Sequence, residues 1–181
     1  MRVAEAPFEA KLARMLGASW VRHTNWNMVT PKPQGVDPGK FRALAQAYRD
    51  QGLHVMASIS LVPQSLSSKP GDSSTSGDAG PLYSRVAPRD WNQWQQFMQD
   101  TAASVGDLID YWEIGNEPNT PHHYWAGTVE EFTDLLKHAA LGIRAGDPGA
   151  TILTAGFTLD PSARGFLIAC WRWGQATIST F

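Results

Sequence analysis

The stretch PGKFRALAQAYRDQGLHVMASISL, residues 38–61, contains one complete helix-and-strand unit. Apolar side chains recur at helical spacing through Phe41, Leu44 and Tyr48, and Gly52 ends this pattern. Residues 53–61 follow as a short, largely apolar run that is bounded by turn residues, which predicts a strand. The stretch therefore predicts a helix that leads directly into a strand.

The same pattern recurs on both sides of this unit. Apolar periodicity predicts further helices and strands, with the helices over 7–16, 88–105, 128–146 and 161–173 and the strands over 18–27, 108–115 and 151–157. Strands separated by helices of ten or more residues need crossover connections, so the sheet is predicted to be parallel and the fold class α/β. Residues 64–87 are rich in Ser, Gly and Pro and predict a flexible loop.

Two architectures fit four strands in a chain of this length. A closed eight-stranded barrel takes ~250 residues, and this chain has 181, so it holds either an open doubly wound sheet or part of a (β/α)8 TIM barrel. Residues 27–39 contain no G-x-G-x-x-G pattern, which weakens a dinucleotide-binding interpretation of the open sheet.

Composition and charge exclude several classes of function. Fifteen basic and seventeen acidic residues give a net charge of −2, which provides no basic field for a nucleic acid. No apolar run is long enough to span a membrane, and residues 1–7 lack the apolar segment of a signal peptide, so we expect no membrane contact and leave the localisation open. Cys170 is the single cysteine, which excludes an internal disulfide and a cysteine-based metal site.

The segment WEIGNEPN, residues 112–119, is the strongest candidate for chemistry. It places Asn116 and Glu117 at the carboxyl end of a predicted strand, which Pro118 ends. In parallel α/β folds the ligands bind at that end of the strands. Position alone makes Glu117 a candidate catalytic acid, and burial among aromatic rings would raise the pKa of such a carboxyl group.

This octapeptide resembles the acid/base strand of the clan A retaining β-glycosidases, with most similarity to glycoside hydrolase family 39 and to relatives of family 5. Residues 17–22, 50–55 and 151–156 resemble the second, third and fifth barrel strands of the same group. The resemblance extends from about residue 8 to residue 166 and implies an N-terminal part of a TIM barrel, about strands 2 to 5 with their helices, with the C-terminal half missing.

The resemblance also implies roles for individual residues. Glu117 would be the proton donor and later the base, Asn116 would hydrogen-bond the sugar 2-hydroxyl, and Arg22 would lie inside the barrel near the nucleophile. Retaining hydrolysis needs a second carboxylate ~5–5.5 Å from the first, and in this group it ends the seventh strand. Glu113 lies about 13 Å below Glu117 on a straight strand at ~3.3 Å per residue, so it is expected to be an interior barrel residue and not the partner carboxylate. Asp160, just beyond the fifth strand, is the other acid to test.

Further residues are candidates for substrate contact. Trp26 and Trp125 offer flat apolar faces for a sugar ring, although simple core packing is the alternative for both. His123 is a candidate hydrogen-bond donor to the substrate, whereas His122 and His123 together lack the spacing of a metal site. We therefore expect neither a metal nor a cofactor.

The sequence thus predicts residues 1–181 to be an incomplete glycoside hydrolase domain that lacks its nucleophile and takes an oligosaccharide or glycoside as its partner. Residues 166–181 do not resemble a sixth strand, which suggests a truncated or frame-shifted reading frame. The alternative function is a non-catalytic carbohydrate-binding or interaction module on a decayed barrel. A half barrel exposes edge strands and apolar helix faces, so we also expect self-association.

Overall fold

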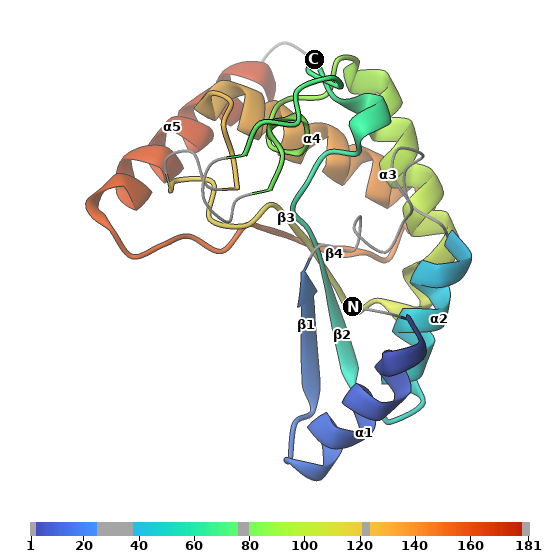
Figure 1. The fold of residues 1–181 in the computed structure, drawn as a ribbon. Helices are drawn as coiled ribbons and strands as arrows, with labels where there is room; N and C mark the ends of the chain where they lie inside the picture. Colours follow the sequence, from blue (N-terminus) through green and yellow to red (C-terminus); the bar gives the residue numbers. More distant parts are fainter. Residues whose placement is uncertain (1–2, 25–37, 76–79, 121–123, 179–181) are drawn as a thin grey trace.

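The computed structural model describes residues 3–24, 38–75, 80–120 and 124–178. Within these ranges the chain alternates between strands and helices, as Figure 1 shows. The strands are β1 (Trp20–Thr24), β2 (His54–Ile59), β3 (Tyr111–Ile114) and β4 (Thr151–Thr154). The α-helices are α1 (Ala6–Met15), α2 (Pro38–Arg49), α3 (Trp91–Val105), α4 (Val129–Gly146) and α5 (Pro161–Ile178), and the 3-10 helices are η1 (Val3–Glu5), η3 (Gln64–Leu66), η4 (Leu82–Ser84) and η5 (Gly106–Leu108).

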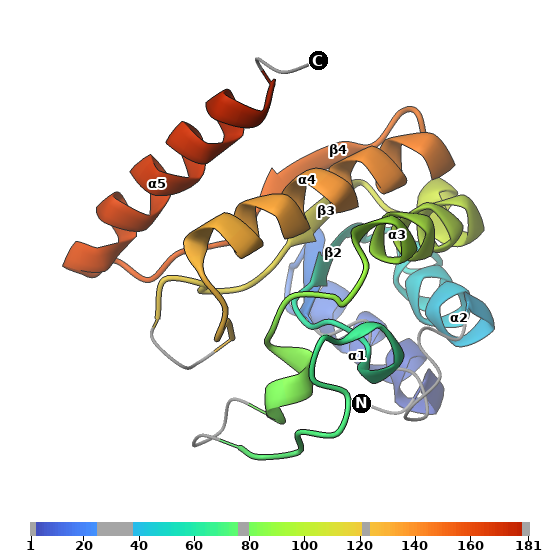
Figure 2. The same cartoon turned by 90° about the horizontal axis from the view of Figure 1, so that it is seen from above.

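The sheet is parallel and its strands follow the order of the chain, β1-β2-β3-β4. A doubly wound sheet reverses its strand order at one point and carries helices on both faces, whereas a barrel sheet does neither. Figures 1 and 2 show α1 to α4 along one side of the sheet, with α5 beside α4. The predicted α/β class and partial TIM barrel are confirmed, and the open doubly wound alternative is wrong.

The hydrophobic core lies between this sheet and its helices. Alternate residues of β2 and β3 point toward the helices and are buried, namely Val55, Ala57, Ile59, Trp112 and Ile114. They pack against large side chains from α2, α3 and α4, namely Phe41, Leu44, Trp94, Met98, Phe132 and Ile143. The opposite face of the sheet carries Arg22 and Thr151, which are exposed, because no described element covers it.

Local signals in the sequence explain where the two central helices begin. The Asp90 carboxylate accepts the backbone N–H groups of Asn92 and Gln93 at the start of α3. Thr128 and Glu131 form a capping box at the start of α4, in which each side chain accepts the backbone N–H of the other residue.

Helix α1 forms where the sequence predicts it but presents its large apolar side chains to solvent. It is held through the buried Ala6 and Ala10, whereas the stripe Phe8, Leu12, Met15 and Leu16 is between 43% and 79% exposed. The stripe has no partner among the described residues because β1 is the edge of the sheet. A spacing that indicates an amphipathic helix therefore does not identify which face of the helix the fold buries.

The loop between β2 and α3 is packed onto the fold in its described residues. The Val62 N–H donates to the Ser84 carbonyl over 2.8 Å, and Ser67 forms a bridge with Pro88. Tyr83 and Arg85 are buried. These contacts hold residues 80–88 against the carboxyl end of β2, while the flexibility expected of residues 64–87 stays a prediction.

Helices α3 and α4 pack closely because two glycines of α4, Gly142 and Gly146, face the backbone of α3. A Cβ atom on Gly142 would lie 2.2 Å from the Gln95 carbonyl oxygen, and one on Gly146 would lie 2.2 Å from that of Gln99. Any side chain at these positions has to push the two helices apart.

Replacing Gly142 by Ala is therefore expected to lower the free energy of unfolding by about 1–3 kcal/mol, the usual cost of overpacking. Gly165→Ala on α5 is the matched control, because no atom lies within 4 Å of its added Cβ. Urea denaturation measures both variants. Gly165→Ala should be neutral or stabilising, and an equal loss in both variants would contradict the close approach of α3 and α4.

Candidate active site

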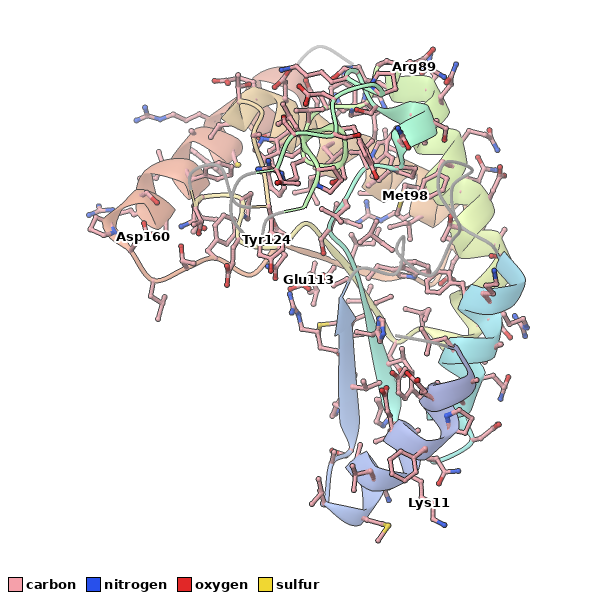
Figure 3. All side chains as sticks on the ribbon, in the orientation of Figure 1. Lys11, Arg89, Met98, Glu113, Tyr124 and Asp160 are labelled. Atoms are coloured by element: carbon pink, nitrogen blue, oxygen red, sulfur yellow. The ribbon has the colours of Figure 1, made fainter. Side chains whose placement is uncertain are left out.

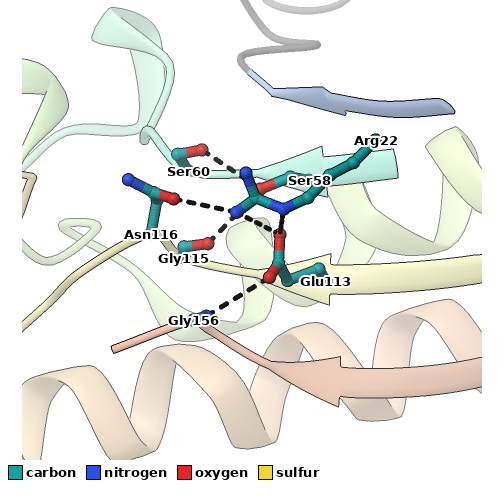
Figure 4. Close-up of polar contacts among 7 residues, drawn as sticks. All are labelled: Arg22, Ser58, Ser60, Glu113, Gly115, Asn116 and Gly156. Carbon is teal, nitrogen blue, oxygen red and sulfur yellow. Dashed lines mark hydrogen bonds and ion pairs between the residues drawn. The ribbon is translucent and has the colours of Figure 1, made fainter. Parts of the chain in front are cut away.

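The polar residues of the candidate site gather at the carboxyl ends of the strands. Figure 4 shows Arg22 from β1, Ser58 and Ser60 from the end of β2, and Glu113 and Asn116 from β3 and the residues after it. The register places Ser58 beside Glu113, and Arg22, which pairs with Met56, lies two residues before that row on β1.

The Glu113 carboxylate connects three strands. Its Oε2 accepts the Arg22 Nε–H over 2.8 Å and lies 2.6 Å from Arg22 Nη2. Its Oε1 accepts the backbone N–H of Gly156, which follows β4, over 3.2 Å. The Glu113 side chain is 8% exposed and that of Arg22 is 39% exposed, so the charge of the more deeply buried partner is compensated at both oxygens.

Arg22 also fixes the orientation of Asn116. The Arg22 Nη2 group donates to Asn116 Oδ1 over 2.8 Å. Because a guanidinium only donates, the amide oxygen of Asn116 must point toward Arg22 and its NH2 group must point away. Among the described residues this NH2 group has no partner, which makes it available to an external acceptor.

Glu117 follows Asn116 in an unusual backbone conformation. Its φ is +44°, the single positive value at a described residue other than glycine. Its N–H donates to the Gly156 carbonyl over 2.8 Å, and its own carbonyl accepts the Thr120 N–H over 3.1 Å. The left-handed conformation turns the chain sharply away from the strand at a cost of about 1–2 kcal/mol.

The side chain of Glu117 is half-buried. Within the part of the chain that the structure describes, its carboxyl group has no hydrogen-bond or ion-pair partner. It differs in this from Glu113, whose oxygens are both occupied. Glu117 is thus the acid at this edge of the sheet that is free to meet a ligand.

Gly115 makes the turn before Glu117 possible. Its φ is +91°, and a Cβ atom at this position would lie 2.8 Å from the Phe132 ring. Its N–H still donates to the Ile59 carbonyl over 2.8 Å, which continues the sheet by one residue. Only glycine satisfies both the backbone conformation and the packing.

Asp160 is engaged as the cap of α5. Its carboxylate accepts the Ser162 N–H over 2.7 Å, the Thr158 hydroxyl over 2.6 Å and the Ser162 hydroxyl. The hydroxyls of Ser162 and Thr158 hold the pKa of Asp160 below its ordinary value. Figure 3 shows Asp160 at the outer end of α5, away from Glu113. These contacts are those of a structural cap.

The remaining predicted contact residues divide into two groups. Trp125 is 5% exposed, its Nε1–H donates to the Thr128 carbonyl over 2.8 Å, and its ring meets the edge of Phe132. This leaves too little exposed ring for stacking on a sugar, and core packing, the alternative interpretation, describes its contacts. Trp26 and His123 lie outside the described residues.

Two negative findings concern the described residues alone. They contain no group of three or more His, Cys, Asp or Glu side chains that could hold a metal ion. None of their helices combines the length and the apolarity that crossing a bilayer requires.

Replacing Glu113 by Gln keeps the shape of the side chain and removes its charge. We expect the free energy of unfolding to fall by about 1.5–3 kcal/mol, because hydrogen bonds to charged groups contribute that much. Asp107→Asn is the matched control: Asp107 also pairs with an arginine, Arg42, over 2.6 Å, but both side chains are largely exposed. Urea denaturation should separate the two variants, with no measurable change for Asp107→Asn. Equal losses would show that Glu113 is an ordinary surface partner.

Comparison with known proteins relates the chain to glycosidases. It is 31% identical over 67 residues to a β-xylosidase from Caldicellulosiruptor saccharolyticus, a match that covers 33% of this chain and 14% of the β-xylosidase. No family model matches the chain. The sequence relationship is therefore distant and covers about a third of the residues.

Solved structures resemble the chain over most of its length. A glucosidase from Croceicoccus marinus has a TM-score of 0.62 at 15% identity, and the match covers 88% of this chain and 36% of the glucosidase. A family 5 subfamily 18 glycoside hydrolase from Streptomyces cattleya, solved with GlcNAc, gives 0.58 at 19% identity over 86% of this chain and 39% of the enzyme. A family 39 glycoside hydrolase from Bacteroides cellulosilyticus gives 0.57 at 18% identity over 84% and 30%.

The chain thus has the fold of one part of a glycosidase TIM barrel and spans between 30% and 39% of these three structures. The predicted similarity to families 5 and 39 is confirmed for the fold.

Proposed function

We propose that this chain is the acid/base part of a glycoside hydrolase barrel that cleaves a β-linked sugar with retention. The observation that carries the proposal is the pair formed by Asn116 and Glu117 at the carboxyl edge of a parallel sheet. The first offers an NH2 group fixed by Arg22, and the second offers an unpaired carboxyl group beside it.

The chemistry assigns one task to each of these side chains. Glu117 gives its proton to the glycosidic oxygen as the bond to the anomeric carbon breaks, and later takes a proton from water. Asn116 binds the sugar 2-hydroxyl through its NH2 group, a contact that strengthens as positive charge develops on the ring. Arg22 keeps the amide in that orientation and does not touch the reacting atoms.

The described residues offer no second carboxylate for the covalent step. Glu113 is occupied by Arg22 and Gly156, and Asp160 caps α5. The proposal therefore assigns the nucleophile to a part of the barrel beyond the described residues. The 181 residues alone are expected to bind a sugar and to hydrolyse it at or near background.

Binding is tested by calorimetry with xylo- and gluco-oligosaccharides. Wild type should bind one series, Glu117→Gln should bind it about equally, and Asn116→Ala should bind at least about five-fold more weakly, the effect of one lost hydrogen bond. The exposed Asn92→Ala on α3 is the matched control and should not alter affinity. Absence of binding in wild type would overturn the proposal.

Chemical competence needs a second assay, because the alternative function, a non-catalytic carbohydrate-binding module, also predicts binding. Sodium azide can attack the anomeric carbon of a phenyl β-glycoside in place of the absent carboxylate, while the glycosidic oxygen takes the proton of Glu117 and leaves as phenol. Phenolate is a poor leaving group, so its departure needs the acid, and we expect azide to raise phenol release at least about ten-fold, below the 10²–10⁴ that general acids contribute. Glu117→Gln should abolish the increase.

The outcomes of this assay separate the two functions. Sugar binding without azide-dependent release favours the binding module. A robust rate without azide that Glu117→Gln abolishes would show instead that the chain contains its own nucleophile.

We further propose that the 181-residue chain self-associates. Exposed apolar side chains lie on both outer helices, among them Phe8 and Met15 on α1 and Trp171 on α5, and one face of the sheet is uncovered by the described elements. Two copies cannot close one regular barrel. Where the sheet of one copy would meet that of the other, α5 of the first copy and α1 of the second would both lie, and a barrel has room there for one helix.

Sedimentation velocity tests this association. The average mass should rise with protein concentration, and the double variant Phe8→Lys, Met15→Lys should shift the distribution toward the monomer. Lys11→Glu on the same helix is the charge-changing control. A stable wild-type monomer at all concentrations would contradict the proposal.

A further inference from the structure

The turn that presents Glu117 needs support from outside its own strand. Its φ of +44° is unfavourable for a residue with a side chain, and β3 ends at Ile114, three residues earlier. The Glu117 N–H and the Gly156 carbonyl share one hydrogen bond of 2.8 Å, which ties the turn to the loop after β4. One such bond does not define the direction of a side chain.

Asn119 supplies the additional connections. The residue is 5% exposed. Its Oδ1 accepts the Thr158 N–H over 3.2 Å, while its Nδ2 donates to the Thr158 hydroxyl over 2.7 Å and to the Thr158 carbonyl over 3.2 Å. The Asn119 carbonyl accepts the Ser162 hydroxyl over 3.1 Å. One buried amide therefore links the β3–α4 loop to the β4–α5 loop in both directions.

The hydrogen bonds of Asn119 also restrain Glu117, two residues earlier in the chain. Pro118, which is buried and has a fixed φ, is the single residue between Glu117 and Asn119. Thr120 continues the attachment, because its hydroxyl lies 3.1 Å from that of Thr158 and its N–H donates to the Glu117 carbonyl. A displacement at Asn119 must therefore rotate the peptide units on both sides of Pro118.

We propose that Asn119 is a positioning residue that holds the Glu117 carboxyl group beside the Asn116 amide. The inference rests on the proposed function and adds to it the residue that fixes the acid. An amide suits the task because it both accepts from the Thr158 N–H and donates to the Thr158 hydroxyl, which aspartate cannot do. Acid catalysis depends on such placement, since an error of about 1 Å can cost about a hundred-fold in rate.

Amide hydrogen exchange of the 181-residue chain, followed by NMR, tests the positioning without any ligand. In Asn119→Ala we expect the Glu117 and Thr120 N–H groups to exchange at least about ten-fold faster, because several hydrogen bonds across the loop are lost together. The N–H groups within α3 and α4 should keep their rates.

Matched variants separate positioning from loss of the fold. Thr158→Ser keeps the hydroxyl that Asn119 contacts and should keep wild-type exchange at Glu117. Asn119→Asp keeps the acceptor, loses the donors and sets a carboxylate against that of Asp160, to which Asn119 Nδ2 donates over 3.3 Å. It should therefore accelerate exchange at Glu117 even if Asn119→Ala does not fold. Unchanged exchange at Glu117 in the folded Asn119 variants would overturn the inference, and so would equal acceleration at all amides.

The azide-dependent release of phenol gives the functional arm. Asn119→Ala should release phenol at least about ten-fold more slowly, and Thr158→Ser should stay within about two-fold of wild type. Absence of azide-dependent release in wild type would overturn the acid role of Glu117 in the proposed function, and the exchange experiment would still decide the positioning. A wild-type rate of release by a folded Asn119→Ala would overturn the inference and leave the proposed function intact.

Discussion

The buried carboxylate of Glu113 is the interaction on which the arrangement of the strand ends depends. It accepts from Arg22 on β1 and from Gly156 after β4, so one side chain of β3 reaches both edges of the sheet. Gly156 in turn accepts from the Glu117 N–H, and Arg22 donates to Asn116. Asn116 is thus connected to the Glu113 carboxylate through Arg22, and Glu117 is connected to it through Gly156.

Much of the fold could be predicted from local signals in the sequence. Gly52 ends a helical pattern and the strand after it begins within two residues, because positive φ stops a helix sharply. The strands are shorter than predicted, for example 54–59 where 53–61 is expected, since the apolar pattern continues into the loops while the ladder bonds do not. Periodicity locates an element more reliably than it locates its ends.

What the sequence could not reveal depends on contacts between distant segments. Glu113 is correctly expected inside the fold, but its partnership with Arg22 requires the register of three strands, which no local pattern contains. Trp125 illustrates the same point. An indole ring suits a sugar platform as well as a core, and no local pattern reveals its contact with the Phe132 ring on α4. The support that Asn119 gives to Glu117 likewise arises from a loop 39 residues away.

The uncovered face of the sheet has a thermodynamic consequence for this network. Arg22 is 39% exposed toward that face, so water and salt weaken its attraction to Glu113. Anything that covers the face lowers the local dielectric constant and strengthens the attraction that orients Asn116. Such coupling is reciprocal. Whatever holds Asn116 more firmly against Arg22 therefore also raises the affinity of the sheet face for the group that covers it. Covering this face would therefore fix Asn116 more firmly, through Arg22.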